Sequence, residues 1–93
     1  MKKTVFDFDI MLVGDDLSVV RSPMIDSVAS IDGVCAVAVE TDGRAFPCLQ
    51  IEVEFEDSKS AIRLHRKIGR ALEKLDGFRI VGAGTMLTDI FDD

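Results

Sequence analysis

The segment QIEVEFEDSKSAIRLHRKIGRALEKLDGFRI, residues 50–80, contains a strand pattern, a helix pattern and a second strand pattern in direct succession. At its start Ile51, Val53 and Phe55 alternate with acidic residues. An alternation of period two predicts a strand that buries one face. Further on, apolar residues recur at intervals of three and four, which predicts an amphipathic helix. The segment therefore predicts a sheet with a helix packed on one side of it.

The limits of this helix are marked by its end residues. Ser58 is a residue type that caps helix N-termini, and Gly77 is typical of the left-handed residue that ends a helix. Residues 78–84, FRIVGAG, begin with a further alternation and predict a short strand, with Arg79 on its outer face.

The same two patterns occur before residue 50. Residues 4–13, TVFDFDIMLV, alternate as a strand does. Ser22 followed by Pro23 is typical of a helix start, and we predict a short helix from there to about Gly33. Residues 34–40, VCAVAVE, are rich in β-branched residues and predict a further strand.

The order of these elements predicts the fold. Asp42-Gly43 favours a tight hairpin into the strand of residues 46–56. The chain then reads β-α-β-β-α-β, which predicts an α+β, ferredoxin-like split β-α-β two-layer sandwich with antiparallel sheet order 4-1-3-2. We expect residues 1–93 to form a single domain, with residues 85–93 as a short apolar and acidic C-terminal tail.

Acidic residues mark the open face of this predicted sheet. Because the apolar residues of the two middle strands face the helices, the intervening acids should gather on the other side. Arg79 is placed to neutralise some of them. The interpretations are a solvated surface, a contact for a basic protein, a mimic of a nucleic-acid backbone, or a weak divalent-cation site. Carboxylates repel phosphate, so RNA binding through this face is not expected. The candidate residues are Asp7, Asp9, Glu52, Glu54 and Glu56.

Basic residues lie along the predicted long helix, on the side opposite its apolar stripe. Residues 59–74 contain six bases and one acid, a charge of +5 that leaves −11 for the rest of the chain. The interpretations are a solvated helix face or a docking surface for an acidic protein, a nucleic-acid backbone or the acidic sheet of a second copy. The candidate residues are Arg63, Arg66, Lys67, Arg70 and Lys74.

Residues that carry catalysis or bind cofactors are sparse. His65 is the only histidine, and it lies on the apolar edge of the long helix, where packing is commoner than catalysis. Cys35 and Cys48 lie on strands joined by a hairpin, close enough in topology to approach one another, although buried small side chains are the better interpretation. We therefore expect no enzyme activity, no cofactor and no dedicated metal site.

The overall composition limits the ligands and the cellular location that we expect. The net charge of −6 disfavours direct nucleic-acid binding, which depends on basic residues that displace counterions. Asp7 and Asp9 interrupt any apolar stretch near the start, so no signal peptide or membrane segment is expected. Two cysteines outside any CxxC are consistent with a reducing cytoplasm.

Three short motifs carry a resemblance to a known family. IEVEFEDSKSAI (51–62), IGRALEKLDGFRIVGAG (68–84) and LTDI (87–90) resemble the small ferredoxin-like N-terminal domain of certain bacterial helix-turn-helix regulators. In that family the last motif opens the DNA-binding helices, which are absent from these 93 residues. The resemblance implies a regulatory or interaction domain, with Leu87, Ile90 and Phe91 either as a remnant docking segment or as a cover for the open end of the core.

The leading hypothesis is therefore a non-catalytic protein-interaction or regulatory module, whose partner is another protein or a second copy in a homodimer. The alternatives are a small acidic inhibitor of a nucleic-acid-binding machine, of the anti-CRISPR or anti-restriction type, and a weak divalent-cation binder. The two charged surfaces separate the first two hypotheses, because the inhibitor depends on the acidic face and a helix-mediated dimer depends on the basic helix.

Overall fold

The computed structural model describes residues 2–14 and 16–83. Six elements follow one another in the predicted β-α-β-β-α-β order. They are β1 (Lys2–Leu12), α1 (Leu17–Ala29), β2 (Val34–Glu40), β3 (Cys48–Phe55), α2 (Ser58–Glu73) and β4 (Phe78–Ala83).

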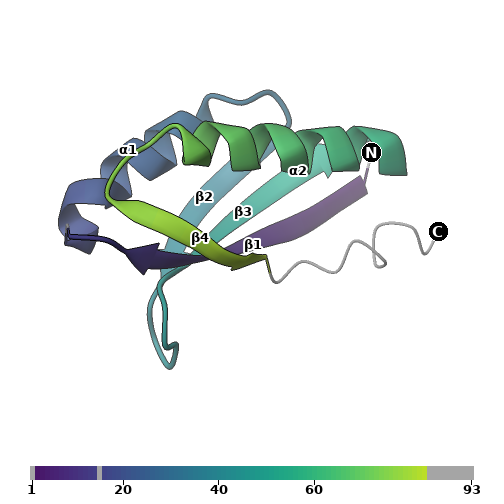
Figure 1. Cartoon of the computed structure of the whole chain (residues 1–93). Helices are drawn as coiled ribbons and strands as arrows, with labels where there is room; N and C mark the ends of the chain where they lie inside the picture. Colours follow the sequence, from purple (N-terminus) through teal and green to yellow (C-terminus); the bar gives the residue numbers. More distant parts are fainter. Residues whose placement is uncertain (1, 15, 84–93) are drawn as a thin grey trace.

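The four strands form one antiparallel sheet in the order β2-β3-β1-β4. This is the predicted order 4-1-3-2 read from the other edge. Both helices cover the same face of the sheet and leave the opposite face open (Figure 1). The α+β class is confirmed, and the arrangement is consistent with the predicted ferredoxin-like layout.

The hydrophobic core lies between the helices and the sheet. Phe6, Phe8 and Ile10 of β1 are buried, and Asp7 and Asp9 between them are partly exposed. From Leu49 to Phe55 of β3, buried and partly exposed side chains alternate in the same way. α1 contributes one row of residues at four-residue spacing, and α2 contributes a second apolar row. Burial of these rows is the main force that holds the helices on the sheet. The buried helix residues are Val20, Met24, Val28, Ala61, Leu64, Ile68 and Leu72.

The first helix begins earlier than the sequence predicts. α1 starts at Leu17 after Asp16, whose backbone is extended, so Ser22 is not its cap and Pro23 lies inside it. Starting at Leu17 allows Val20 to join the buried row that continues through Met24. Burial of this extra turn outweighs the disruption that an internal proline causes.

Replacing Pro23 by alanine is expected to raise the free energy of unfolding by about 1–2 kcal/mol. Pro23 is exposed, lacks the N–H that would donate to the carbonyl of Val19, and crowds that carbonyl with its ring. Part of the gain is lost because alanine gives the unfolded chain more freedom. Urea unfolding measures the change, with Ser22→Ala as the control that alters helix propensity alone. A Pro23→Ala variant less stable than the parent would show that the proline suits its position.

Two further boundaries differ from the sequence prediction. Asp57, rather than Ser58, caps α2: the backbone N–H of Ser60 donates to the Asp57 carboxylate over 2.8 Å. That hydrogen bond lowers the pKa of Asp57. The connection between β2 and β3 spans residues 41–47 instead of forming a tight two-residue turn, and it projects beyond the sheet (Figure 1).

The predicted C-terminal tail, including Leu87, Ile90 and Phe91, lies outside the described residues. Within residues 2–14 and 16–83, neither helix has the length and apolarity needed to cross a bilayer.

Candidate interaction surfaces

The open face of the sheet carries acidic residues of both middle strands, as the pleat predicts. Phe6 and Phe8 on β1 and Ile51 and Val53 on β3 are buried against the helices. Side chains alternate between the two faces of a strand, so the intervening residues point away from the helices. Asp7, Asp9, Glu52 and Glu54 therefore share one face.

The register of β1 on β3 separates these carboxylates. Glu52 lies opposite Val5, and Glu54 lies opposite Lys3. The Lys3 ammonium contacts the Glu54 carboxylate at 3.3 Å, and this contact raises the pKa of Lys3. Asp7 lies opposite Gln50. No carboxylate of β1 therefore lies directly across from one of β3, although Asp7 is the diagonal neighbour of Glu52 on the same face.

The remaining candidates also depart from expectation. Arg79 pairs with Met11, so it lies beyond the acids of β1 rather than opposite them. Glu56 follows the end of β3 in an exposed bend. Among the described residues no group of three or more His, Cys, Asp or Glu side chains is arranged to hold a metal ion.

A small hollow lies on the open face beside Glu52. Its volume is about 200 Å³. The small alanines of β2 leave room for it, because Ala36 lies next to Glu52 and Ala38 next to Gln50. Val5, which is 46% exposed, closes the other side. The lining residues are Val5, Ala36, Val37, Ala38, Gln50 and Glu52.

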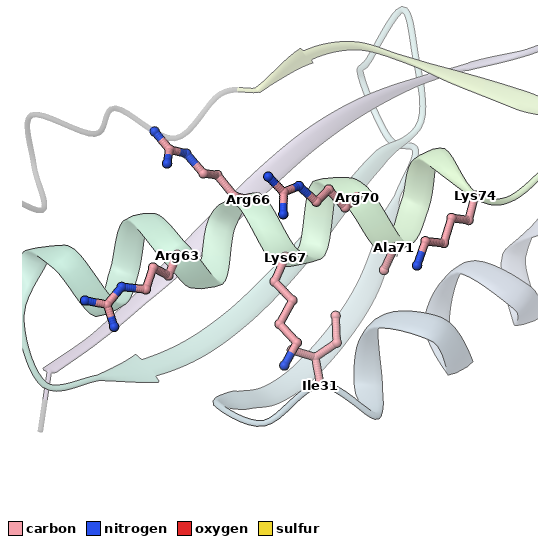
Figure 2. A pocket seen from close by; sticks show the side chains of 7 residues that line it. All are labelled: Ile31, Arg63, Arg66, Lys67, Arg70, Ala71 and Lys74. Atoms are coloured by element: carbon pink, nitrogen blue, oxygen red, sulfur yellow. The ribbon is translucent and has the colours of Figure 1, made fainter.

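The second surface, which we call the basic groove, runs along α2. Five cationic side chains surround a groove of about 550 Å³ whose apolar part consists of Ile31 and Ala71 (Figure 2). Lys67 extends toward Ile31, and Arg66 and Arg70 extend away from it (Figure 2). The five cationic residues are Arg63, Arg66, Lys67, Arg70 and Lys74, and all are exposed.

The charges of the basic groove are only partly balanced by nearby acids, since Arg63 interacts electrostatically with Asp57. Within the part of the chain that the structure describes, none of the five forms an ion pair with a carboxylate. The groups spread along the helix instead of converging on one point, as Figure 2 shows. Such a row suits several anionic groups spaced along a partner better than one small anion.

His65 is packed against aromatic rings, as its position in the sequence predicts. Its ring centroid lies 4.9 Å from that of Phe6, edge to face, and 4.9 Å from that of Phe8, stacked. Nε2 of His65 is buried and has no hydrogen-bond partner among the described residues. Burial lowers the pKa of His65 below its ordinary value of 6.5, so the ring is neutral in the folded protein at neutral pH.

Acidification is expected to destabilise the protein through His65. The unfolded chain takes up the proton near pH 6.5 and the folded chain only at lower pH, so stability falls as the pH drops below that value. Urea midpoints at about pH 7.5 and about pH 5.5 measure the loss. A His65→Leu variant should lose less stability over this interval. An equal loss in both proteins would assign the effect to other groups.

The two cysteines do not approach one another. Cys48 is buried and pairs with Glu40, and Cys35 lies exposed at the irregularity near the other end of β2. Roughly five residues of strand, about 16 Å, separate the two positions, which is too far for a disulfide. Burial raises the pKa of the Cys48 thiol, so Cys48 behaves as a small apolar residue.

Sequence reasoning missed the hollow and the role of Lys3. The parity of Lys3 with Asp7 places it on the open face, and that signal was present in the sequence. Its pairing with Glu54 depends on the register between β1 and β3, which the alternation does not specify.

Comparison of the chain with protein-family models gives no match, and comparison with curated protein sequences gives none either. The resemblance of residues 51–90 to a regulator domain therefore stays a prediction. The function has to be argued from the two charged surfaces.

Proposed function

We propose that this protein is a non-catalytic interaction module of ferredoxin-like fold whose basic groove binds a carboxylate-bearing segment of another protein chain. The observation that carries the proposal is the row of five exposed cations on α2, none of which forms an ion pair with a carboxylate among the described residues.

The row is unfavourable for the isolated helix. Arg66 has a like charge four residues away at Arg70, and Arg70 has another at Lys74. Like charges at this spacing destabilise a helix by roughly 0.2–0.5 kcal/mol per pair. A carboxylate-bearing partner removes this repulsion, whereas a merely solvated face does not require so many like charges on one side.

The groove favours a protein partner over a nucleic acid. Ile31 and Ala71 contribute apolar surface to the lining beside the cations. A surface that combines apolar and charged groups is typical of a protein interface. A nucleic-acid backbone offers phosphates but little apolar surface, and the net charge of −6 repels a long polyanion.

The inhibitor hypothesis receives less support from the open face. A mimic of nucleic acid needs dense rows of negative charge in place of phosphates. On β1 the positions opposite Glu54 and Glu52 hold Lys3 and Val5. A cationic and an apolar side chain thus interrupt the rows of negative charge that a nucleic-acid mimic requires.

Fluorescence anisotropy with two labelled probes tests the proposal. The first probe is a peptide of alternating glutamate and leucine, and the second is a single-stranded oligonucleotide of equal charge. We expect the peptide to bind, and Arg66→Gln with Arg70→Gln to weaken binding about tenfold, as the loss of roughly 1.4 kcal/mol from two charged contacts implies.

The matched control is Arg21→Gln, which removes an exposed arginine from α1, outside the groove. It should leave peptide binding unchanged. Equal binding by the parent and the double variant would refute the proposal. Tighter binding of the oligonucleotide through the same two arginines would identify a nucleic-acid site instead.

A further inference from the structure

We infer that the hollow beside Glu52 is a docking site for a cationic side chain, and that its occupant is an arginine of the basic groove of a second copy of this chain. The inference rests on the proposed function for the basic groove. It adds a second surface and names the partner.

The hollow has the shape and chemistry that an arginine requires. Its apolar walls, from Val5, Ala36 and Ala38, suit the aliphatic stem of a long side chain. Glu52 and Gln50 stand at its edge and supply oxygen acceptors for a guanidinium. Glu54 is already engaged by Lys3, whereas Glu52 forms no ion pair within the described residues.

The spacing of the two charged rows also agrees. Arg66, Arg70 and Lys74 follow one another at four-residue steps, each a rise of about 6 Å along α2. Glu52 and Glu54 on one face of β3 are separated by two residues, about 6.7 Å. When one arginine enters the hollow, the next cation lies near Glu54, whose carboxylate it would share with Lys3.

The position of the two surfaces dictates the kind of assembly. The helices cover one face of the sheet and the hollow lies on the other, so the donor and acceptor surfaces are on opposite sides of the molecule (Figure 1). Contact between different surfaces of identical chains is heterologous and does not close into a twofold dimer. The expected product is a short linear stack of copies.

The contact is expected to be weak and sensitive to salt. Four strands spaced about 4.8 Å apart and averaging eight residues give an open face of roughly 500 Å², below the ~800 Å² that each partner usually contributes to a stable complex. Exposed charges are screened beyond about 10 Å at ordinary salt. The stack should therefore form at low ionic strength and high protein concentration.

Sedimentation velocity with the purified chain and two neutralised variants tests the inference. One variant carries Glu52→Gln and Glu54→Gln, and the other carries Arg66→Gln and Arg70→Gln. At about 20 mM salt the parent's sedimentation coefficient should rise with concentration, and at about 500 mM salt it should not. Each variant alone should sediment as a monomer.

Mixing the two variants supplies the decisive outcome. One retains an intact basic groove and the other an intact hollow, so the mixture should give a capped one-to-one dimer and nothing larger. The matched control is a mixture of an Arg21→Gln variant and an Asp26→Asn variant, which change exposed charges of α1. This mixture should stack as the parent does. A parent that stays monomeric at low salt, or a mixture that fails to form dimers, would overturn the inference.

Failure here is distinguishable from failure of the proposed function. If the chain stays monomeric but binds the glutamate peptide through Arg66 and Arg70, the basic groove stands and a second copy is not its partner. If neither occurs, both proposals are wrong.

Discussion

Replacing Phe6 by alanine is expected to remove most of the protein's free energy of unfolding at room temperature. Phe6 is fully buried in the middle of the central strand β1, opposite Ile51, and its ring packs on His65 at 4.9 Å. Truncation of a buried phenylalanine costs about 3–5 kcal/mol. A domain of this size has a total stability near the lower end of roughly 5–15 kcal/mol, so the loss removes most of it.

Circular dichroism and urea unfolding of Phe6→Ala measure this effect. The control is Val5→Ala at the neighbouring position, whose side chain is 46% exposed on the opposite face. That change should alter the free energy of unfolding by less than about 1 kcal/mol. If both variants lose the same stability, the burial pattern of β1 is not the one described.

Replacing Gly33 by alanine is expected to destabilise the protein by about 2–3 kcal/mol. Gly33 has φ +100°, and a Cβ at this position would lie 3.1 Å from Cδ2 of Leu64 and 3.3 Å from the carbonyl oxygen of Glu54. The Leu64 side chain can shift, but the Glu54 backbone is held because its N–H donates to the Gly33 carbonyl over 2.8 Å. Alanine thus adds both backbone strain and crowding.

Gly43→Ala separates these two contributions. Gly43 also has positive φ, at +67°, but a Cβ there would meet nothing within 4 Å. This control should lose only the roughly 1–2 kcal/mol of the left-handed conformation. Thermal unfolding of both variants provides the comparison, and an equal loss at the two glycines would show that Leu64 and Glu54 accommodate the extra methyl group.

The sequence predicts the architecture because the two periodicities are clear where burial is one-sided. Ile51, Val53 and Phe55 alternate without exception, and the apolar and basic sides of α2 are well separated. α1 is harder to predict because the helix runs through Pro23. The helix-start signal at Ser22 would leave Val20 outside the helix. Packing of Val20 against the core instead places the start of α1 at Leu17.

The candidate site is predicted in part for the same reason. Helical spacing alone assigns the five cations of α2 to one exposed side, and strand parity assigns Asp7 and Glu52 to the open face. The pairing of Lys3 with Glu54 and the hollow beside Ala36 depend on the register between β1, β2 and β3. Register is fixed by packing across the whole sheet, which a single strand does not reveal.

Chemical shifts of the backbone amides during titration with the glutamate–leucine peptide test the central claim most directly, because they locate the contact residue by residue. We expect the largest changes on residues 63–74 of α2 and on Ile31, with the amides of β1 and β3 nearly unchanged. Changes centred on the open sheet face, or no changes at a peptide excess, would contradict a docking role for the basic groove.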